Sequence, residues 1–256
     1  MKSRLWHPRE RGFALALMFP LLGALLLCLF FFFRQAHMIV TDKESRGACR
    51  VELLKAQTQV GISLEKLLRL NGEIRAAKHA RTLALAAMAA AVAAENPVAF
   101  TIAQKALHVA DHTLKVLKTA QFALLAKAQF EMNSGVVNAR KALQAVWFIR
   151  NRSRSTLAGA QGVVLPGSPA HLAVRVRDPE DPNPEYVPES DFSQRQALQV
   201  SWRVHLNRSE EKTPWIKQDW RLERACGATL VEEPVENSFK AKLIEAKSSS
   251  KSSFFF

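Results

Sequence analysis

The sequence predicts a membrane-anchored α+β protein with one N-terminal transmembrane helix, a long antiparallel helical hairpin and a small C-terminal antiparallel β-sheet. Three observations support this fold class. Residues 12–33 contain no charged side chain. Residues 34–150 are rich in Ala, Leu, Lys and Gln, and their apolar side chains recur every seven positions. From residue 171 onward the apolar side chains alternate with a period of two, which is typical of strands.

The uncharged run predicts the transmembrane helix. At 1.5 Å per residue, residues 12–33 extend over roughly 30 Å, which is the thickness of a hydrocarbon core. No small-x-small motif follows the run, so we expect an uncleaved anchor rather than a signal peptide. Residues 1–11 form a basic leader with four Lys or Arg and one acid, which predicts that this end stays in the cytoplasm. We therefore expect a single-pass protein of the inner (cytoplasmic) membrane that contacts lipid through residues 12–33, with its bulk in the periplasm.

Residues 34–150 predict a hairpin of two helices. The break is at Glu95–Pro97, because proline ends one helix and begins the next. Each arm carries an apolar row at heptad spacing that we expect to be buried against the other arm. The row of the first arm consists of Leu53, Val60, Leu67 and Ile74, and that of the second of Ile102, Val109, Val116, Ala123, Phe130 and Val137. The alternative is a more compact bundle that folds back at Asn71–Gly72 and Asn133–Gly135.

A polar linker at residues 151–170 leads to the predicted β domain at residues 171–236. Period-two alternation in His171–Arg177, Ala197–Leu206 and Trp215–Val231 predicts about three strands. So few strands are not stable alone, so we expect a helix to cover the apolar face of the sheet. The acidic segment Asp178–Asp191 is expected to be a solvated loop that leans on the basic helices. Residues 237–256 are rich in Lys and Ser, which predicts a disordered tail.

The positive charge is concentrated in the hairpin. The chain has a net charge of +13, and residues 34–161 contain 19 Lys or Arg against 8 acids. This basic surface fits an anionic polymer or lipid surface, or simply a solvated helical face.

The sequence contains no recognisable catalytic set. It lacks a Gly-rich phosphate loop, a nucleophile elbow and a paired CxxC motif. His108, Asp111 and His112 could begin a metal site, with His79 as a third imidazole, but the heptad register places His79 on the outer face of its helix. We therefore expect no enzyme activity, no cofactor and no metal.

Two of the three cysteines are expected to pair. Cys28 lies in the uncharged run, whereas Cys49 and Cys226 lie in the part expected to be exported. A hairpin returns its second arm to the start of the first, which brings the β domain beside Cys49. An oxidising compartment then allows a disulfide between Cys49 and Cys226.

The stretch RERGFALALMFPLLG, at residues 9–23, resembles the N-terminus of TadE/TadG-like proteins of tight-adherence (Flp) pilus systems. The resemblance implies peptidase cleavage between Gly12 and Phe13 and a structural role in a pilus or pseudopilus-like envelope assembly. Leu17 stands where many pilins carry an acid, which favours a minor or assembly component over a major subunit. The implied partners are other assembly proteins and further copies of the chain, through the apolar helix and the hairpin.

Two alternatives stay open at this point. One is an adaptor-like periplasmic subunit of a secretion or efflux system, although such adaptors also place β structure before their hairpin. The other is a basic hairpin module that binds an anionic polymer, for which strongly salt-dependent binding would be diagnostic. Nucleic acid is not the expected partner.

Overall fold

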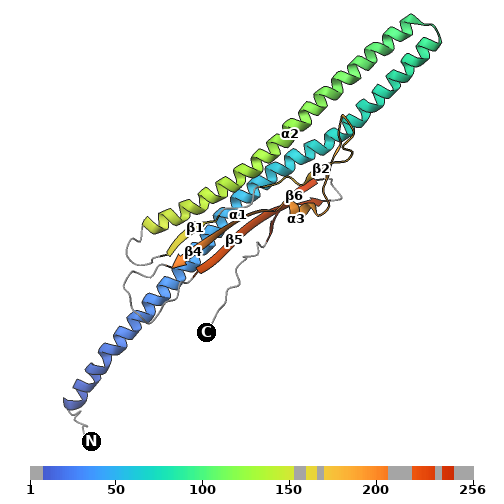
Figure 1. Ribbon diagram of the computed structural model, residues 1–256. Helices are drawn as coiled ribbons and strands as arrows, with labels where there is room; N and C mark the ends of the chain where they lie inside the picture. The colour runs from blue at the N-terminus through green and yellow to red at the C-terminus, as the bar shows by residue number, and fades with distance from the viewer. Residues whose placement is uncertain (1–7, 153–159, 166–169, 207–220, 234–237, 245–256) are drawn as a thin grey trace, which may run out of the picture.

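Two long antiparallel helices organise the protein (Figure 1). The computed structural model describes residues 8–152, 160–165, 170–206, 221–233 and 238–244. Helix α1 runs from Pro8 to Ala93 and helix α2 from Pro97 to Arg152. The predicted hairpin is therefore present, and it is not folded into a shorter bundle.

The turn between the helices lies at the predicted break. Glu95 adopts a positive φ of 50°, which reverses the chain direction after α1. Asn96 caps α2, because its Oδ1 accepts a hydrogen bond from the backbone N–H of Ala99 at 3.0 Å. Pro97 occupies the first helical position, where no backbone donor is needed. The weaker candidate breaks at Asn71–Gly72 and Asn133–Gly135 do not interrupt either helix.

Six strands follow the hairpin. The larger sheet is antiparallel, in the order β1-β4-β5-β6, and its strands are β1 (Ala160–Val164), β4 (Leu198–Leu206), β5 (Arg221–Glu233) and β6 (Ser238–Ile244). The smaller sheet pairs β2 (Val174–Val176) with β3 (Tyr186–Pro188), and the short helix α3 (Phe192–Arg195) precedes β4.

Three strands of the described part of the chain lie where the sequence predicted none, and one of them is β3, in the segment expected to be a loop. Strand β1 falls within the predicted linker, and β6 falls within the segment predicted to be disordered. The Lys- and Ser-rich composition of the tail hid the residues that hold β6 in place. Phe239 packs on the core, and its backbone N–H donates to Glu65 Oε1 of α1 at 2.8 Å. Trp220 and Ile216, expected in a strand, lie outside the described residues.

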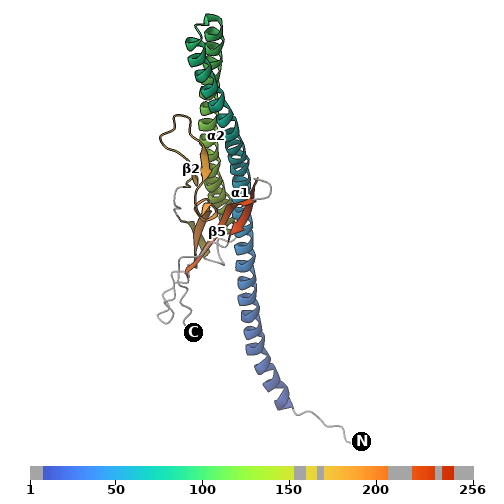
Figure 2. The same cartoon turned by 90° about the vertical axis from the view of Figure 1, so that its right-hand side faces the viewer.

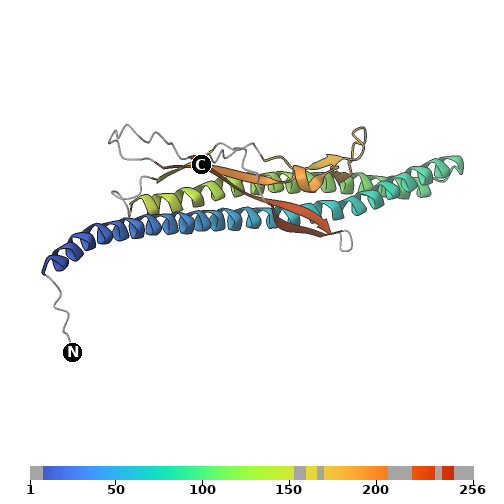
Figure 3. The same cartoon turned by 90° about the horizontal axis from the view of Figure 1, so that it is seen from below.

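The larger sheet covers one side of the hairpin along the middle of α1, from about Cys49 to Glu65. Strands β5 and β6 contact α1, while β1 and β4 contact α2 (Figures 1 and 3). The shared core includes Leu53 and Val60 of α1, Leu143 of α2, and Trp202 of β4, which is fully buried. The hairpin thus supplies the cover that a small sheet requires. The end of the hairpin at the turn extends past the strands without such a cover (Figure 3).

One predicted heptad row is buried and the other is exposed. Leu53, Val60, Leu67 and Ile74 of α1 are all buried, as predicted. The row predicted for α2 is wrong, because its large members lie in solvent. The helix instead buries the row one residue later, including Ala103, Ala110 and Leu117. Successive residues lie about 100° apart around an α-helix, so both rows satisfy the period but only one faces α1.

The predicted transmembrane helix is contradicted. Within the described part of the chain, no helix is long and apolar enough to cross a membrane. Residues 12–33 are the first part of α1, which continues without interruption to Ala93. The described fold is thus α+β, with two long helices and a small antiparallel sheet.

Candidate functional site

The first candidate surface is the apolar beginning of α1. From Met18 to Phe33 every side chain is exposed, including five phenylalanines and six leucines. This part of α1 extends beyond the sheet and beyond the end of α2 (Figure 2). Large contiguous apolar surfaces of this kind mark contact sites. Cys28, whose thiol is free, is exposed on the same segment.

The predicted cleavage position lies close to the start of the same helix. Gly12 and Phe13 are in the first turns of α1, which begins at Pro8. The structure describes the backbone at both positions but not the side chain of Phe13. The Gly12–Phe13 peptide is therefore placed in helical backbone, immediately before the exposed apolar segment.

A disulfide fastens the sheet to α1. The structure joins Cys49 to Cys226 of β5, with Cα atoms 6.4 Å apart, and both residues are buried. An ion-pair cluster lies alongside it, in which Asp42 contacts Arg46 at 2.6 Å and Arg224 of β5 at 3.3 Å. Covalent and ionic links therefore tie the same strand to α1 where the helix leaves the sheet toward its N-terminus.

Amide side chains of the helices hydrogen-bond the backbone of the β domain. Buried Gln57 donates from Nε2 to the carbonyl of Gln196 at 2.7 Å and to that of Ala228 at 3.2 Å. Asn71 donates to the carbonyl of Tyr186 at 2.7 Å and accepts from its N–H at 3.1 Å. These contacts were not predicted, and Asn71 was considered only as a break in the alternative, more compact bundle. Polar residues at heptad core positions were the available signal, since buried amides need partners.

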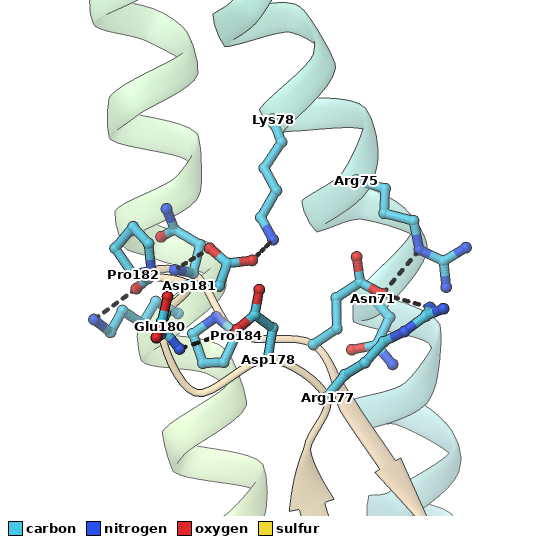
Figure 4. A network of polar contacts seen from close by, with 12 residues as sticks. Asn71, Arg75, Lys78, Arg177, Asp178, Glu180, Asp181, Pro182 and Pro184 are labelled. Carbon is cyan, nitrogen blue, oxygen red and sulfur yellow. Dashed lines mark hydrogen bonds and ion pairs between the residues drawn. The ribbon is translucent and has the colours of Figure 1, made fainter.

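The acidic segment docks on the hairpin, as predicted (Figure 4). Lys78 of α1 forms an ion pair with Asp181, and Arg75 contacts Glu185 at 3.1 Å. From the other helix, Lys118 donates to the carbonyl of Pro182 at 2.9 Å. The segment therefore binds both helices at the level where the sheet ends. It also contains strand β3, so it is not simply a solvated loop.

The ion pair with Lys78 lowers the pKa of Asp181. Partial burial of the carboxyl group raises its pKa, but the hydrogen bond and positive charge of Lys78 and the N–H of Asn183 outweigh that effect, and the net shift is downward from 3.8. The ionised carboxylate is thus favoured in the folded protein.

The histidines considered for metal binding do not converge. His79, His108 and His112 are all exposed, and Asp111 is engaged by Arg81 at 2.8 Å. Across the described part of the chain, no group of three His, Cys, Asp or Glu residues could hold a metal ion.

The second candidate surface is the outward face of α2. We call it the outer row, and it consists of Ile102, Val109, Val116, Ala123, Phe130 and Val137. Ile102 and Val109 are each 64% exposed and Phe130 is 68% exposed. The heptad spacing of this row was predicted correctly. The row was expected to lie between the two helices, however, and it faces solvent instead.

Comparison of the chain with models of known protein families, with curated proteins and with solved structures found no match.

Proposed function

We propose that the protein is a structural subunit of a pilus- or pseudopilus-like envelope assembly, joined to its neighbours through the apolar beginning of α1. The carrying observation is the segment Met18–Phe33, whose side chains are exposed on every side of a helix that stands clear of the rest of the molecule. An apolar surface around the whole circumference of a helix is suited to burial among several other helices. The resemblance of residues 9–23 to pilin-related N-termini supports the same role.

The remainder of the molecule fits a rigid spacer in such an assembly. Helix α1 continues from the apolar segment into the hairpin without a break. The hairpin is therefore held at a fixed distance from the apolar segment. The disulfide between Cys49 and Cys226 prevents the sheet from separating from this helix. Because such bonds persist in oxidising compartments, it also supports an extracytoplasmic location for the hairpin and sheet.

Cys28 provides a direct test, because it is exposed within the proposed contact segment. Mild oxidation of cells that make the full-length protein is expected to join Cys28 to a neighbouring subunit, seen as a larger species on a non-reducing gel. The Cys28→Ser variant is the matched control and should give no such species. Replacing Leu25 by Arg should reduce the cross-link severalfold, because a charge would have to be buried between helices.

The result that contradicts the proposal is equally specific. If the protein stays monomeric in the cell, and neither oxidation nor Leu25→Arg changes its migration, the apolar segment is not a subunit contact. Retention of the Cys49–Cys226 disulfide in each variant would show that the fold itself is intact.

A further inference from the structure

Helix α2 carries two apolar rows, and among the residues that the structure describes only one of them is covered. The buried row faces α1, while the outer row faces solvent from Ile102 to Val137. Single exposed apolar residues are ordinary on protein surfaces, but a contiguous row is not. At 1.5 Å per residue the outer row extends over roughly 50 Å of helix.

The spacing of the outer row is that of a coiled-coil seam. Its members recur every seven residues. Four of them are followed four positions later by a small side chain, namely Ala106, Thr113, Ala120 and Ser134, and Lys127 and Lys141 stand at the other two such positions. Small neighbours leave room for the side chains of an approaching helix. A seven-residue repeat drifts by about 20° per heptad on a straight helix, so a flat surface could contact only part of it. A second helix that winds around α2 can follow all of it.

The charges beside the outer row select the kind of helix. Lys105, Lys115, Lys127 and Lys141 are exposed on α2. The helix contains eight Lys or Arg but only two acids, Asp111 and Glu131, and Asp111 already pairs with Arg81. Two copies of α2 brought together would repel each other, whereas a helix flanked by Asp and Glu would be attracted.

We propose that the outer row of α2 is the docking site for an amphipathic helix of another protein, whose apolar heptad seam is flanked by acidic residues. The docked helix would lie along the face of α2 that is turned away from α1. The site goes beyond the proposed role of the apolar beginning of α1, because it lies on the other helix and uses different residues. Loss of either contact therefore leaves the other intact.

Two synthetic peptides can test the proposal on the full-length protein. Both have about five heptads with Ile and Leu at the seam positions, and they differ only in having Glu or Lys at the flanking positions. Fluorescence anisotropy is expected to show saturable binding of the Glu peptide, weakened at least tenfold between 50 and 500 mM salt, and no binding of the Lys peptide. The double variant Val109→Ser, Phe130→Ser should weaken binding of the Glu peptide at least tenfold.

A matched double variant controls for the loss of exposed apolar surface elsewhere. Val51 and Leu83 are 61% and 58% exposed on α1, away from the outer row, so Val51→Ser with Leu83→Ser should leave binding unchanged. All four positions are exposed, so the variants are expected to keep the helical circular dichroism of the parent.

Three results would overturn the proposal. One is equal binding of the Glu and Lys peptides, or binding that the outer-row variant does not weaken. A second is binding to vesicles of anionic lipid that depends on the outer row in the absence of any peptide binding. The third is self-association in sedimentation experiments that the outer-row variant abolishes, which would assign the row to a second copy.

Discussion

The half of the hairpin covered by the sheet and the half that extends beyond it bury different kinds of side chains. The covered half packs Leu53, Val60, Met132 and Leu143 against Trp202 and its neighbours in one core. The free half has a small cluster around Ile74 and Leu114, and it then continues to the turn on buried alanines, namely Ala84, Ala91, Ala103 and Ala110.

This difference allows one pair of helices to hold a stable core under the sheet and to leave apolar surface free for a partner. Burial contributes about 25 cal/mol per Å² of apolar surface, so large side chains under a sheet stabilise far more than alanines between two helices. Alanine instead favours the helical conformation itself and lets the helices approach closely. The free half therefore keeps its shape while Ile102, Val109 and Val116 of the outer row remain available for a partner.

The largest loss of stability is expected when the disulfide, which lies in the covered half, is removed. Cys49 and Cys226 are 177 residues apart, and in the chain-entropy model closing such a loop stabilises by about 5 kcal/mol. The double variant Cys49→Ala, Cys226→Ala should lose most of this free energy of unfolding in a urea titration. Cys28→Ala is the control, since that thiol is exposed and free. An unchanged urea midpoint for the double variant would show that the disulfide does not hold the covered half together.

Truncation of one large side chain in each half would test the contrast directly. Trp202 is fully buried, so Trp202→Ala should cost about 4 kcal/mol, whereas Leu114→Ala in the small cluster should cost about 2 kcal/mol. Both values are measured by urea unfolding at constant pH. Equal losses would mean that the free half is packed as well as the covered half, and would remove the energetic basis of the comparison.

Two glycines give a sharper test of close packing. A Cβ atom added to Gly135 would overlap the Cβ of Ala56, whereas one added to Gly72 meets nothing within 4 Å. Gly135→Ala should therefore destabilise by about 2 kcal/mol through overpacking in the covered half. Gly72→Ala should stabilise by up to about 1 kcal/mol, because alanine is the better helix former. Thermal unfolding measures both variants. The contrast would be contradicted if Gly135→Ala and Gly72→Ala shifted the melting temperature in the same direction.

The smallest effect is expected at the boundary between the halves, where Lys78 pairs with Asp181. The pKa of Asp181 is lower in the folded protein than its ordinary value of 3.8. Its stabilising contribution is therefore present above about pH 4 and is lost as pH falls through the folded pKa. Asp181→Asn should reduce stability slightly at neutral pH and by less at pH 3, as measured by urea unfolding at both. If the difference in unfolding free energy between the parent and Asp181→Asn grew as the pH fell, the ion pair would not be its cause.

Much of the fold could be predicted from periodicity and helix-breaking residues. The two helices, the turn at Pro97, the strand Leu198–Leu206 and the buried row of α1 follow from spacings within single segments. Strand β6 could not be found in this way, because it depends on pairing with β5 and on contacts of Phe239 with α1. The transmembrane assignment rested on the absence of charge and on the length of residues 12–33, whereas in the described part of the chain no helix is long and apolar enough to cross a membrane.

Some features of the candidate surfaces could likewise be predicted from the sequence, and others could not. The apolar beginning of α1 and the heptad spacing of the outer row are visible in the sequence, since both depend only on which residues follow one another. The docking of Asp181 on Lys78 and the amide contacts of Gln57 and Asn71 join residues more than 100 positions apart. Their partners are set by how the sheet sits on the hairpin, which no local pattern encodes.

The sequence by itself determined that α2 carries an apolar row at heptad spacing, from Ile102 to Val137, and that cysteines exist at positions 49 and 226. Only the tertiary structure decided that the row of Ala103 and Ala110 faces α1, that Ile102 and Val109 face outward, and that the two cysteines meet. The physical reason is that a repeat fixes the direction of side chains around a helix axis. Which direction is buried depends on contacts with segments distant in the chain.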